Sequence, residues 1–334
     1  MPGIGVISNR NARLNKLNPK LKDRMAFMLG RGGELASTGS LDDAHKAVEA
    51  FKRFEIDMVA ISGGDGTAHR TIEVLIEVYG DTPLPPVLLL PTGTQNMVPK
   101  SFGIRDSGVA TLVLTLARYR HNVPLRTIRR NMLKVNEHYS FMFSVGVAPR
   151  FLKEYYDRGQ TTPVGAAKLL ASLAYDAVRG GTMTAEMAAK FSFEQQVDHG
   201  PWSRMAGSAI FCSFIEELAL GFKVFPRAGW DPNVFETVIG TGPATRFATA
   251  LPHFWTGSTR RIDDFDRYLA RTVEFRLDKP ECYTLDGEVY EPLDRFVVSA
   301  GPEIDFVVPG VKLRGGDPRV RWGQTGPWDM RYFV

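Results

Sequence analysis

The first part of the chain alternates short apolar runs with longer segments of helical periodicity. The apolar runs predict buried strands at residues 3–8, 56–61 and 86–91. The segments between them predict amphipathic helices at residues 21–30, 38–54, 67–79 and 107–120, and we expect residues 9–18 to form a loop. Apolar strands that alternate with helices indicate a parallel sheet with helices on both faces. We therefore expect a doubly wound α/β domain.

Ser40 and Asp43 mark the start of one of these helices. A serine followed three residues later by an acidic residue is a capping-box pattern, which satisfies free backbone N–H groups at a helix start. Leu41, Ala44, Val48 and Phe51 then recur with a helical period.

Beyond Arg126 the pattern changes to many extended segments separated by turn residues. We expect strands at residues 131–137, 139–147, 185–194, 206–214, 234–240, 272–277, 282–285, 295–300 and 305–308. Helical patterns interrupt them at residues 164–178 and 244–255. The pattern predicts a C-terminal β-sandwich domain with two helices, and a ligand cleft is expected between the two domains.

Composition and charge exclude few functions. The chain has 334 residues, a formal net charge of +4 and 44% hydrophobic residues, which is ordinary for a soluble globular protein. This mild basicity permits a nucleotide substrate or an anionic membrane surface. Because the basic residues are not collected into a tail, we do not expect nucleic-acid binding.

The cysteines and the N-terminus indicate the compartment. Cys212 and Cys282 are far apart, with no His or Cys at metal-ligand spacing, which favours a reducing compartment without disulfides. The first ten residues lack the charged start and apolar core that are typical of a signal peptide, and no run approaches the roughly 18 apolar residues of a membrane span. We expect a cytoplasmic protein that meets any lipid at the membrane surface.

The stretch SGGDGT, residues 62–67, joins a predicted strand to a predicted helix. Glycines let a backbone approach a ligand closely, and a helix N-terminus suits an anion. The stretch is not a P-loop, because the Lys-Ser/Thr pair is missing. Asp65 would repel a phosphate directly, so its expected role is to hold Mg²⁺ or to accept a proton. On its own, the stretch is equally well explained as a tight turn with Asp65 as the helix cap.

A second loop of this kind, PTGTQN at residues 91–96, follows the next predicted strand. Thr92 and Thr94 supply hydroxyls, Gly93 an open backbone and Asn96 an amide. Two such loops at the carboxyl ends of parallel strands would face the crevice where open α/β sheets bind ligands.

The third stretch, LDGE at residues 285–288, lies between two extended runs. Asp286-Gly287 is a strong hairpin signal, and alone it predicts only a turn. A functional role requires Asp286 and Glu288 to project into the interdomain cleft, which periodicity does not decide.

Together these three stretches, in this order and spacing, resemble the diacylglycerol kinase catalytic family, which includes bacterial lipid kinases, sphingosine kinases and ceramide kinases. The resemblance is good over about the first hundred residues and thin between residues 151 and 279. It implies an α/β ATP-binding domain over residues 1–126, to which the segment 304–334 returns. It also implies a β-sandwich lipid-binding domain over residues 127–303.

The resemblance implies roles for individual residues. The residues that would line the phosphates of ATP are Gly63, Gly64, Gly66 and Thr67, with Asp65 near Mg²⁺. The residues that would complete the nucleotide site are Thr92, Gly93, Thr94 and Asn96, together with Asn9 and Thr38, which match loop residues that approach ATP in such proteins. Asp286 would be the general base on the lipid hydroxyl, with Glu288 beside it. In sphingosine-type relatives the glycine-loop aspartate is also argued to be the base, so Asp65 competes for that role.

The chain departs from the family pattern in several loops. The first loop usually has Asn-Pro-x-Ser-Gly, and here residues 9–13 are Asn-Arg-Asn-Ala-Arg. Arg10 and Arg13 would meet phosphate by charge, or they are solvated loop residues. His69-Arg70 replaces a common Asn-Glu pair, and Gln95-Asn96-Met97 replaces Gly-Asn-Asp. These departures bear on the nucleotide contacts and on the identity of the lipid.

The resemblance implies an ATP- and Mg²⁺-dependent lipid kinase that phosphorylates a primary hydroxyl of diacylglycerol, ceramide or a sphingoid base. We expect the protein at the inner face of the membrane. Whether it forms a homodimer is left open by the sequence. The alternatives are a soluble kinase of the NAD kinase or phosphofructokinase type, which also carries a Gly-Gly-Asp-Gly loop, and a catalytically silent lipid- or nucleotide-binding relative. The arginine-dense segment 118–130 would dock on anionic head groups, or it is a solvated hinge. The aromatic side chains of residues 251–257 would meet a membrane interface, or they belong to a buried helix end.

Overall fold

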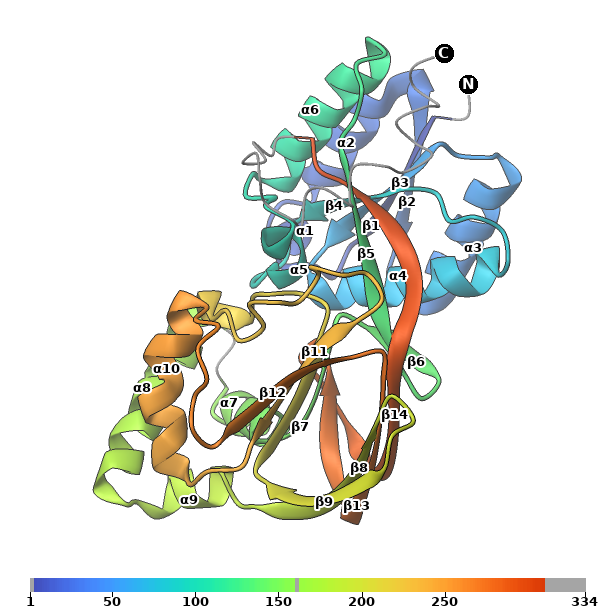
Figure 1. Cartoon of the computed structure of the whole chain (residues 1–334). Coiled ribbons are helices and arrows are strands. Elements are labelled where there is room, and N and C mark those ends of the chain that lie inside the picture. Colours follow the sequence, from blue (N-terminus) through green and yellow to red (C-terminus); the bar gives the residue numbers. More distant parts are fainter. Residues whose placement is uncertain (1–2, 160–161, 310–334) are drawn as a thin grey trace. The chain divides into compact units, whose positions relative to one another are not determined.

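The structure is a computed structural model that describes residues 3–159 and 162–309 (Figure 1). These residues divide into two compact units, residues 3–130 with 302–309 and residues 131–301. Strands β5 (Thr127–Val135) and β14 (Glu288–Val307) each contain a boundary between the units. Most of the segment expected to return to the first domain, residues 310–334, lies outside the described residues.

The first unit is built on a parallel sheet. Its strands, in the order in which they pair, are β4 (Val87–Pro91), β3 (Met58–Gly63), β1 (Ile4–Asn9) and β2 (Gly33–Thr38). The end of β14 pairs in parallel with β4, with Phe306 beside Val87. From β1 the chain continues to β2 on one side, and from β3 to β4 on the other. The topological switch point, where open α/β sheets bind ligands, therefore lies between β1 and β3.

Helices cover both faces of this sheet. They are α1 (Arg13–Leu17), α2 (Lys20–Leu29), α3 (Leu41–Arg53), α4 (Asp65–Tyr79), α5 (Met97–Ser101) and α6 (Gly108–Arg120), with a 3₁₀ turn at Gly30–Gly32. Apolar side chains of α2 and α6 pack with Ile4, Val6 and other strand residues in one core. On the other face, a side chain at Gly5 would overlap the Phe51 ring of α3, so this glycine lets the helix lie close. The predicted doubly wound α/β arrangement is confirmed.

The structure tests the predicted starts of two helices, α3 and α4. The capping box is confirmed: the Asp43 N–H donates to Ser40 Oγ over 3.1 Å, and the Ser40 N–H donates to Asp43 Oδ2 over 3.2 Å. Helix α4 begins at Asp65, two residues before the predicted start at Thr67. Its N-cap is Gly64, and no side chain caps it.

Three short elements of the first unit were not predicted. The loop expected at residues 9–18 contains helix α1, because the Leu14 N–H donates to the Thr92 carbonyl oxygen over 3.1 Å and fixes this segment against the second loop. Strand β2 is only partly buried, so its apolar signal is weak. Helix α5 has five residues, too few to show a periodicity.

The second unit is rich in strands. After β5 its strands are β6 (His138–Ser140), β7 (Met142–Gly146), β8 (Phe191–Val197), β9 (Trp202–Gly207), β10 (Ala209–Ser213), β11 (Phe235–Gly240), β12 (Phe265–Ala270), β13 (Thr272–Leu285) and β14. They pair antiparallel in the order β12-β11-β10-β7-β13-β14, and β8 and β9 extend from β13. Buried phenylalanines such as Phe143, Phe193 and Phe275 dominate the core of this unit. The predicted strand-rich C-terminal domain is confirmed.

The helices of the second unit differ from the expectation. The two predicted helices are present as α8 (Pro163–Arg179) and α10 (Ala244–Thr256). Two further helices were not predicted, α7 (Val147–Asp157) and α9 (Thr182–Met187). The prediction of an extended segment from residue 185 was wrong for residues 185–187, because α9 packs Met187 into a small core with α7 and α8. Among residues 3–159 and 162–309, no helix has the length and apolar character needed to cross a membrane.

Candidate phosphate-binding site

Asn9 and Thr67 meet over the switch point of the parallel sheet. Asn9 is the last residue of β1, and Thr67 lies in the first turn of α4, which follows β3. The Asn9 Nδ2 donates to Thr67 Oγ1 over 2.8 Å, and Asn9 Oδ1 accepts the Asn11 N–H over 2.8 Å. The family resemblance implies that both residues lie near ATP, and the structure brings them together at the carboxyl ends of the strands.

The two glycine-containing loops pack directly against each other. A Cβ atom built on Gly93 would lie 2.3 Å from the Gly64 Cα, and one on Gly64 would lie 3.1 Å from the Gly93 Cα. Only glycines permit such an approach. The Thr92 N–H also donates to the Gly63 carbonyl oxygen over 3.0 Å, and a Cβ on Gly63 would overlap the Thr67 side chain. The loops therefore form one connected structure, with Gly66 in the first turn of α4 beside them.

Hydrogen bonds of Asn96 and Thr92 help to fix the conformation of the second loop. Asn96 has a left-handed backbone, with φ of 51°. Its Oδ1 accepts the Gly93 N–H over 3.0 Å, and its Nδ2 donates to the Gly93 carbonyl oxygen over 3.1 Å. The Thr92 hydroxyl is buried, 3.4 Å from Ser62 Oγ. Thr94 is partly exposed, and among the described residues its hydroxyl has no hydrogen-bond partner.

Asp65 joins α4 to α5. Its side chain is buried, and Oδ1 accepts the backbone N–H of Val98 over 3.0 Å. It is the first helical residue rather than the cap, so the reading of Asp65 as a helix cap was wrong. An ionised carboxylate offers about four acceptor positions, so it can accept hydrogen bonds and contact a metal ion at the same time. Within the described part of the chain, no three or more His, Cys, Asp or Glu side chains gather as a cation site.

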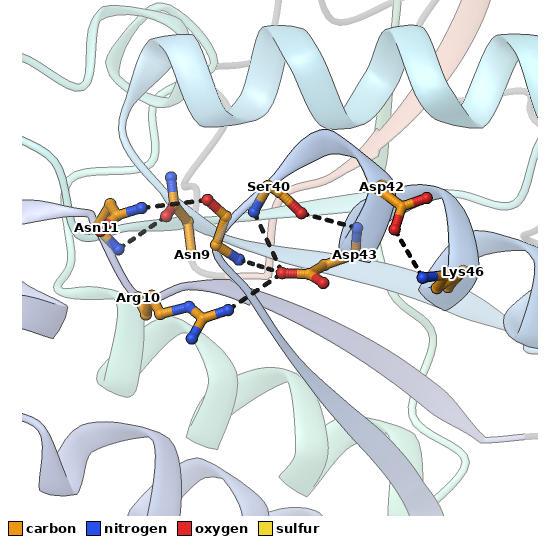
Figure 2. Close-up of polar contacts among 8 residues, drawn as sticks. Asn9, Arg10, Asn11, Ser40, Asp42, Asp43 and Lys46 are labelled. Carbon is orange, nitrogen blue, oxygen red and sulfur yellow. Dashed lines mark hydrogen bonds and ion pairs between the residues drawn. The ribbon is translucent and has the colours of Figure 1, made fainter.

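The first loop is held by Asp43 at the start of α3 (Figure 2). Its Oδ2 accepts from Arg10 Nη2 over 3.1 Å and from the Gly39 N–H over 2.9 Å. The hydrogen bond from the Gly39 backbone is the largest cause that lowers the pKa of Asp43. Desolvation opposes it, and weaker hydrogen bonds from Ser40 and Arg10 lower the pKa further. Arg10 is therefore an ion-pair partner of Asp43 in this structure, and Arg13 is exposed at the start of α1.

Thr38 and Asn15 complete the carboxyl edge of the sheet. Thr38 ends β2 beside Asn9, and its carbonyl oxygen accepts the Arg10 N–H over 3.0 Å. Asn15 Nδ2 donates to the Asn9 carbonyl oxygen over 2.7 Å from helix α1. Sequence reasoning missed Asn15, because the segment was taken as a loop. A buried amide within a basic, otherwise exposed helix carries no signal in the sequence.

Asp286 and Glu288 belong to the second unit. Asp286 and Gly287 have φ values of 49° and 88° and form the predicted hairpin turn between β13 and β14. Asp286 is buried, and its Oδ1 accepts the N–H groups of Phe141 and Met142 over 3.0 and 2.9 Å. Glu288 is exposed. Burial raises the pKa of Tyr156 on α7, and the charge of Glu288 adds to this rise.

The candidate residues thus fall into two groups. Those gathered at the carboxyl edge of the parallel sheet are Asn9, Thr38, Gly63, Gly64, Asp65, Gly66, Thr67, Thr92, Gly93, Thr94 and Asn96. The other two, Asp286 and Glu288, lie at the β13–β14 turn of the second unit.

The residues of the first group all lie in the part of the chain that matches a known family model. Residues 4–127 match the family model of the diacylglycerol kinase catalytic domain. A segment of 114 residues is 34% identical to "Lipid kinase YegS" of Escherichia coli K12, covering 32% of this chain and 38% of the relative. The "Probable lipid kinase YegS" of Salmonella arizonae is 26% identical over 160 residues, 47% of this chain and 51% of the relative. The chain therefore matches between about two fifths and one half of the length of these relatives.

The fold has solved counterparts. The crystal structure of a diacylglycerol kinase from Bacillus anthracis superposes with a TM-score of 0.62 at 13% identity, covering 92% of this chain and 96% of that one. A second structure from the same organism gives a TM-score of 0.66 at 14% identity, covering 92% and 97%. At this identity the likeness concerns the fold alone. The similarity to the diacylglycerol kinase catalytic domain is therefore carried by residues 4–127, and the solved structures show that the chain shares their fold.

Proposed function

We propose that the protein is an ATP-dependent lipid kinase that transfers the γ-phosphoryl group to a primary hydroxyl of a lipid such as diacylglycerol, ceramide or a sphingoid base. The observation that carries the proposal is the contact of the Gly64 and Gly93 backbones at the carboxyl ends of β3 and β4, beside the switch point of the sheet. The family match of residues 4–127 and the lipid kinases among the relatives support the choice of a lipid acceptor.

The loops fit a polyphosphate. The first N–H groups of a helix have no acceptor within the helix, and in α4 no side chain caps them. The positive end of the helix dipole favours an anion at the same place. Because Gly63, Gly64 and Gly66 carry no side chains, phosphate oxygens can approach these N–H groups directly. Backbone N–H groups would therefore stabilise the negative charge of the phosphates, as the lysine of a P-loop does in other proteins.

Asp65 fits a role beside Mg²⁺. When bound, this ion would neutralise charge on the phosphates, as in other phosphoryl-transfer enzymes. Mg²⁺ is commonly held by one or two carboxylates together with phosphates and water, so a single protein carboxylate is compatible with such a site. The bond from Val98 fixes the orientation of the Asp65 carboxylate. We assign Asp65 the dual role of positioning α5 and contributing a metal ligand.

Asp286 is the proposed general base. In the transfer, the lipid hydroxyl oxygen forms a bond to the γ-phosphorus, the bond to the β–γ bridging oxygen breaks and ADP leaves. The hydroxyl proton passes to the Asp286 carboxylate, whose orientation is fixed by two backbone N–H donors. A positioned base contributes roughly 10²–10⁴-fold to such a rate. Glu288 is its neighbour across the turn.

The class of phosphate acceptor is tested by comparing lipid and water-soluble substrates. The protein is assayed with ATP and Mg²⁺ against diacylglycerol, ceramide and sphingosine in mixed micelles, and against NAD and fructose 6-phosphate in solution. We expect phosphorylation of at least one lipid and of neither soluble acceptor. Phosphorylation of NAD or fructose 6-phosphate alone would place the protein among soluble kinases. ATP binding without transfer to any acceptor would identify a silent relative, and both results would overturn the proposal.

A further inference from the structure

Helices α1 and α2 present a strongly cationic outer surface in the first unit. Between residues 13 and 24 the exposed cations are Arg13, Lys16, Lys20, Lys22 and Arg24, against one acidic residue, Asp23. None of these five side chains has an ion-pair partner among the residues that the structure describes. We call this the α1–α2 surface.

The arginines of residues 118–130 differ in this respect. Arg120 donates to the carbonyl oxygens of Met28 and Leu29 at the end of α2. Arg129 forms ion pairs with Asp305 and Glu303, and Arg130 is buried. Because these cations serve the fold, the segment 118–130 is a poor candidate for binding an anionic partner.

The α1–α2 surface also carries exposed apolar side chains. Phe27 on α2 is 88% exposed, and Leu17 at the end of α1 is 71% exposed. Leu14 adds a third apolar group, at 42%. The opposite side of α2 buries Leu21, Met25 and Leu29, so Phe27 is turned away from the core.

This surface is anchored directly to the candidate phosphate site. The Leu14 N–H donates to the carbonyl oxygen of Thr92, and the Asn15 side chain donates to that of Asn9. Helix α1 thus contacts the ends of both β1 and β4 with its inner side. A partner bound to its outer side lies next to the loops to which we assign phosphate binding.

We propose that the α1–α2 surface docks the protein on an anionic lipid bilayer. The five cations complement the negative surface charge of such a membrane, and Phe27 and Leu17 would insert among the lipids. A nucleic acid would satisfy the charge but leave the apolar groups exposed, so the combination favours a bilayer. The proposal deepens the proposed function, since a kinase for membrane lipids must reach them at the bilayer.

The test is co-sedimentation with phosphatidylcholine vesicles, either pure or with about one third phosphatidylglycerol as the anionic lipid. We expect binding to the anionic vesicles only, weakened by added salt. Replacing three cations together, Lys20→Gln, Lys22→Gln and Arg24→Gln, should weaken it about 100-fold. Phe27→Ser should weaken it about 10-fold.

Matched controls remove similar groups elsewhere. The triple variant Arg260→Gln, Arg261→Gln, Lys279→Gln removes the same charge from other exposed positions, and Phe54→Ser removes an aromatic ring that is 53% exposed. Both controls should bind vesicles as the unchanged protein does. Equal losses in the controls and in the α1–α2 variants, or no loss in either, would overturn the proposal. Tighter binding to a DNA duplex than to anionic vesicles at the same salt would also overturn it.

A second readout separates this proposal from the proposed function. Phosphorylation of a short-chain diacylglycerol dissolved as monomers requires the kinase site but no bilayer. The α2 variants should retain this activity and lose activity on diacylglycerol in vesicles. Vesicle binding that depends on α2, without phosphorylation of any lipid, would sustain the docking surface and contradict the kinase. Full activity of the α2 variants on anionic vesicles would contradict the docking surface and sustain the kinase.

Discussion

The Asp65 carboxylate accepts the backbone N–H of Val98 over 3.0 Å and so joins the first turn of α4 to helix α5. The bond ties the end of the first glycine loop to the end of the second. A residue that sequence alone assigns to a metal or a proton therefore also holds together the loops that would surround the phosphates.

The two roles of Asp65 can be separated by comparing two substitutions. Asp65→Asn keeps an oxygen that can accept from Val98 but removes the charge. We expect it to unfold like the unchanged protein while losing its Mg²⁺-dependent activity. Asp65→Ala removes both, and should also lower the free energy of unfolding by about 1–3 kcal/mol. Urea unfolding and activity across a Mg²⁺ titration measure these effects. An active Asp65→Asn enzyme that is indifferent to Mg²⁺ would remove Asp65 from the metal site.

Gly93→Ala tests the contact between the two loops. The new methyl group would lie 2.3 Å from the Gly64 Cα, so the loops must separate. We expect a loss of about 1–3 kcal/mol in the free energy of unfolding, and at least about a 10-fold loss of ATP affinity, because the N–H groups that face phosphate are displaced. The control is Gly32→Ala, since a Cβ at Gly32 meets nothing within 4 Å. Unchanged ATP binding by calorimetry in Gly93→Ala would show that the loop contact does not matter for the nucleotide.

Asp286→Asn tests the assignment of the general base. The asparagine Oδ1 can still accept from Phe141 and Met142, so the hairpin should remain in place. We expect kcat to fall by about 10²–10⁴-fold while ATP binding persists. Glu288→Gln, two residues away and exposed, should have a much smaller effect on kcat. Near-normal turnover of Asp286→Asn would leave Asp65 as the remaining candidate for the base.

Arg10→Gln tests whether the arginine of the first loop serves the nucleotide. Its guanidinium is paired with Asp43, and the pair is solvent-exposed. Because a surface pair of this kind contributes little to stability, we expect the free energy of unfolding to stay nearly unchanged. We expect ATP affinity to stay within about 2-fold, because the phosphate contacts come from backbone N–H groups. A loss of about 10-fold or more in ATP affinity, without a change in stability, would show that Arg10 contacts phosphate.

Glu236 in the second unit should make stability depend on pH. It is fully buried, and burial raises its pKa above the ordinary value of 4.5, opposed by Arg227 and Arg267. A carboxyl whose folded pKa is raised stabilises the fold below its unfolded pKa, and loses this contribution as pH rises through the folded pKa. The unfolding free energy of the unchanged protein, relative to Glu236→Gln, should therefore fall as pH rises above about 4.5. A difference that is constant with pH would contradict the raised pKa.

The parts of the fold that follow from the sequence are those in which local pattern and burial agree. Strands β1, β3 and β4 are continuous apolar runs, and the Ser40–Asp43 capping box fixes the start of α3. Helix α1 and strand β2 were not predicted, because distant residues stabilise them. Helix α1 is bonded to Thr92, and β2 pairs with β1.

The sequence predicts which residue types form the candidate site, but it does not predict which residues they contact. The glycines and threonines of the two loops predict a phosphate site, and the structure places both loops at one edge of the sheet. The pairing of Asp65 with the Val98 N–H and of Arg10 with Asp43 joins residues about thirty positions apart. Such pairs depend on how the loops cross in space, which no local pattern encodes.

The central claim is that the protein phosphorylates a lipid. The most direct measurement is incubation with γ-labelled ATP, Mg²⁺ and a total lipid extract, followed by separation into organic and aqueous phases and identification of the labelled product. The account predicts label in an organic-phase phospholipid, and about 10²–10⁴-fold less label with Asp286→Asn. Label confined to water-soluble products, or no transfer by a protein that binds ATP, would contradict it.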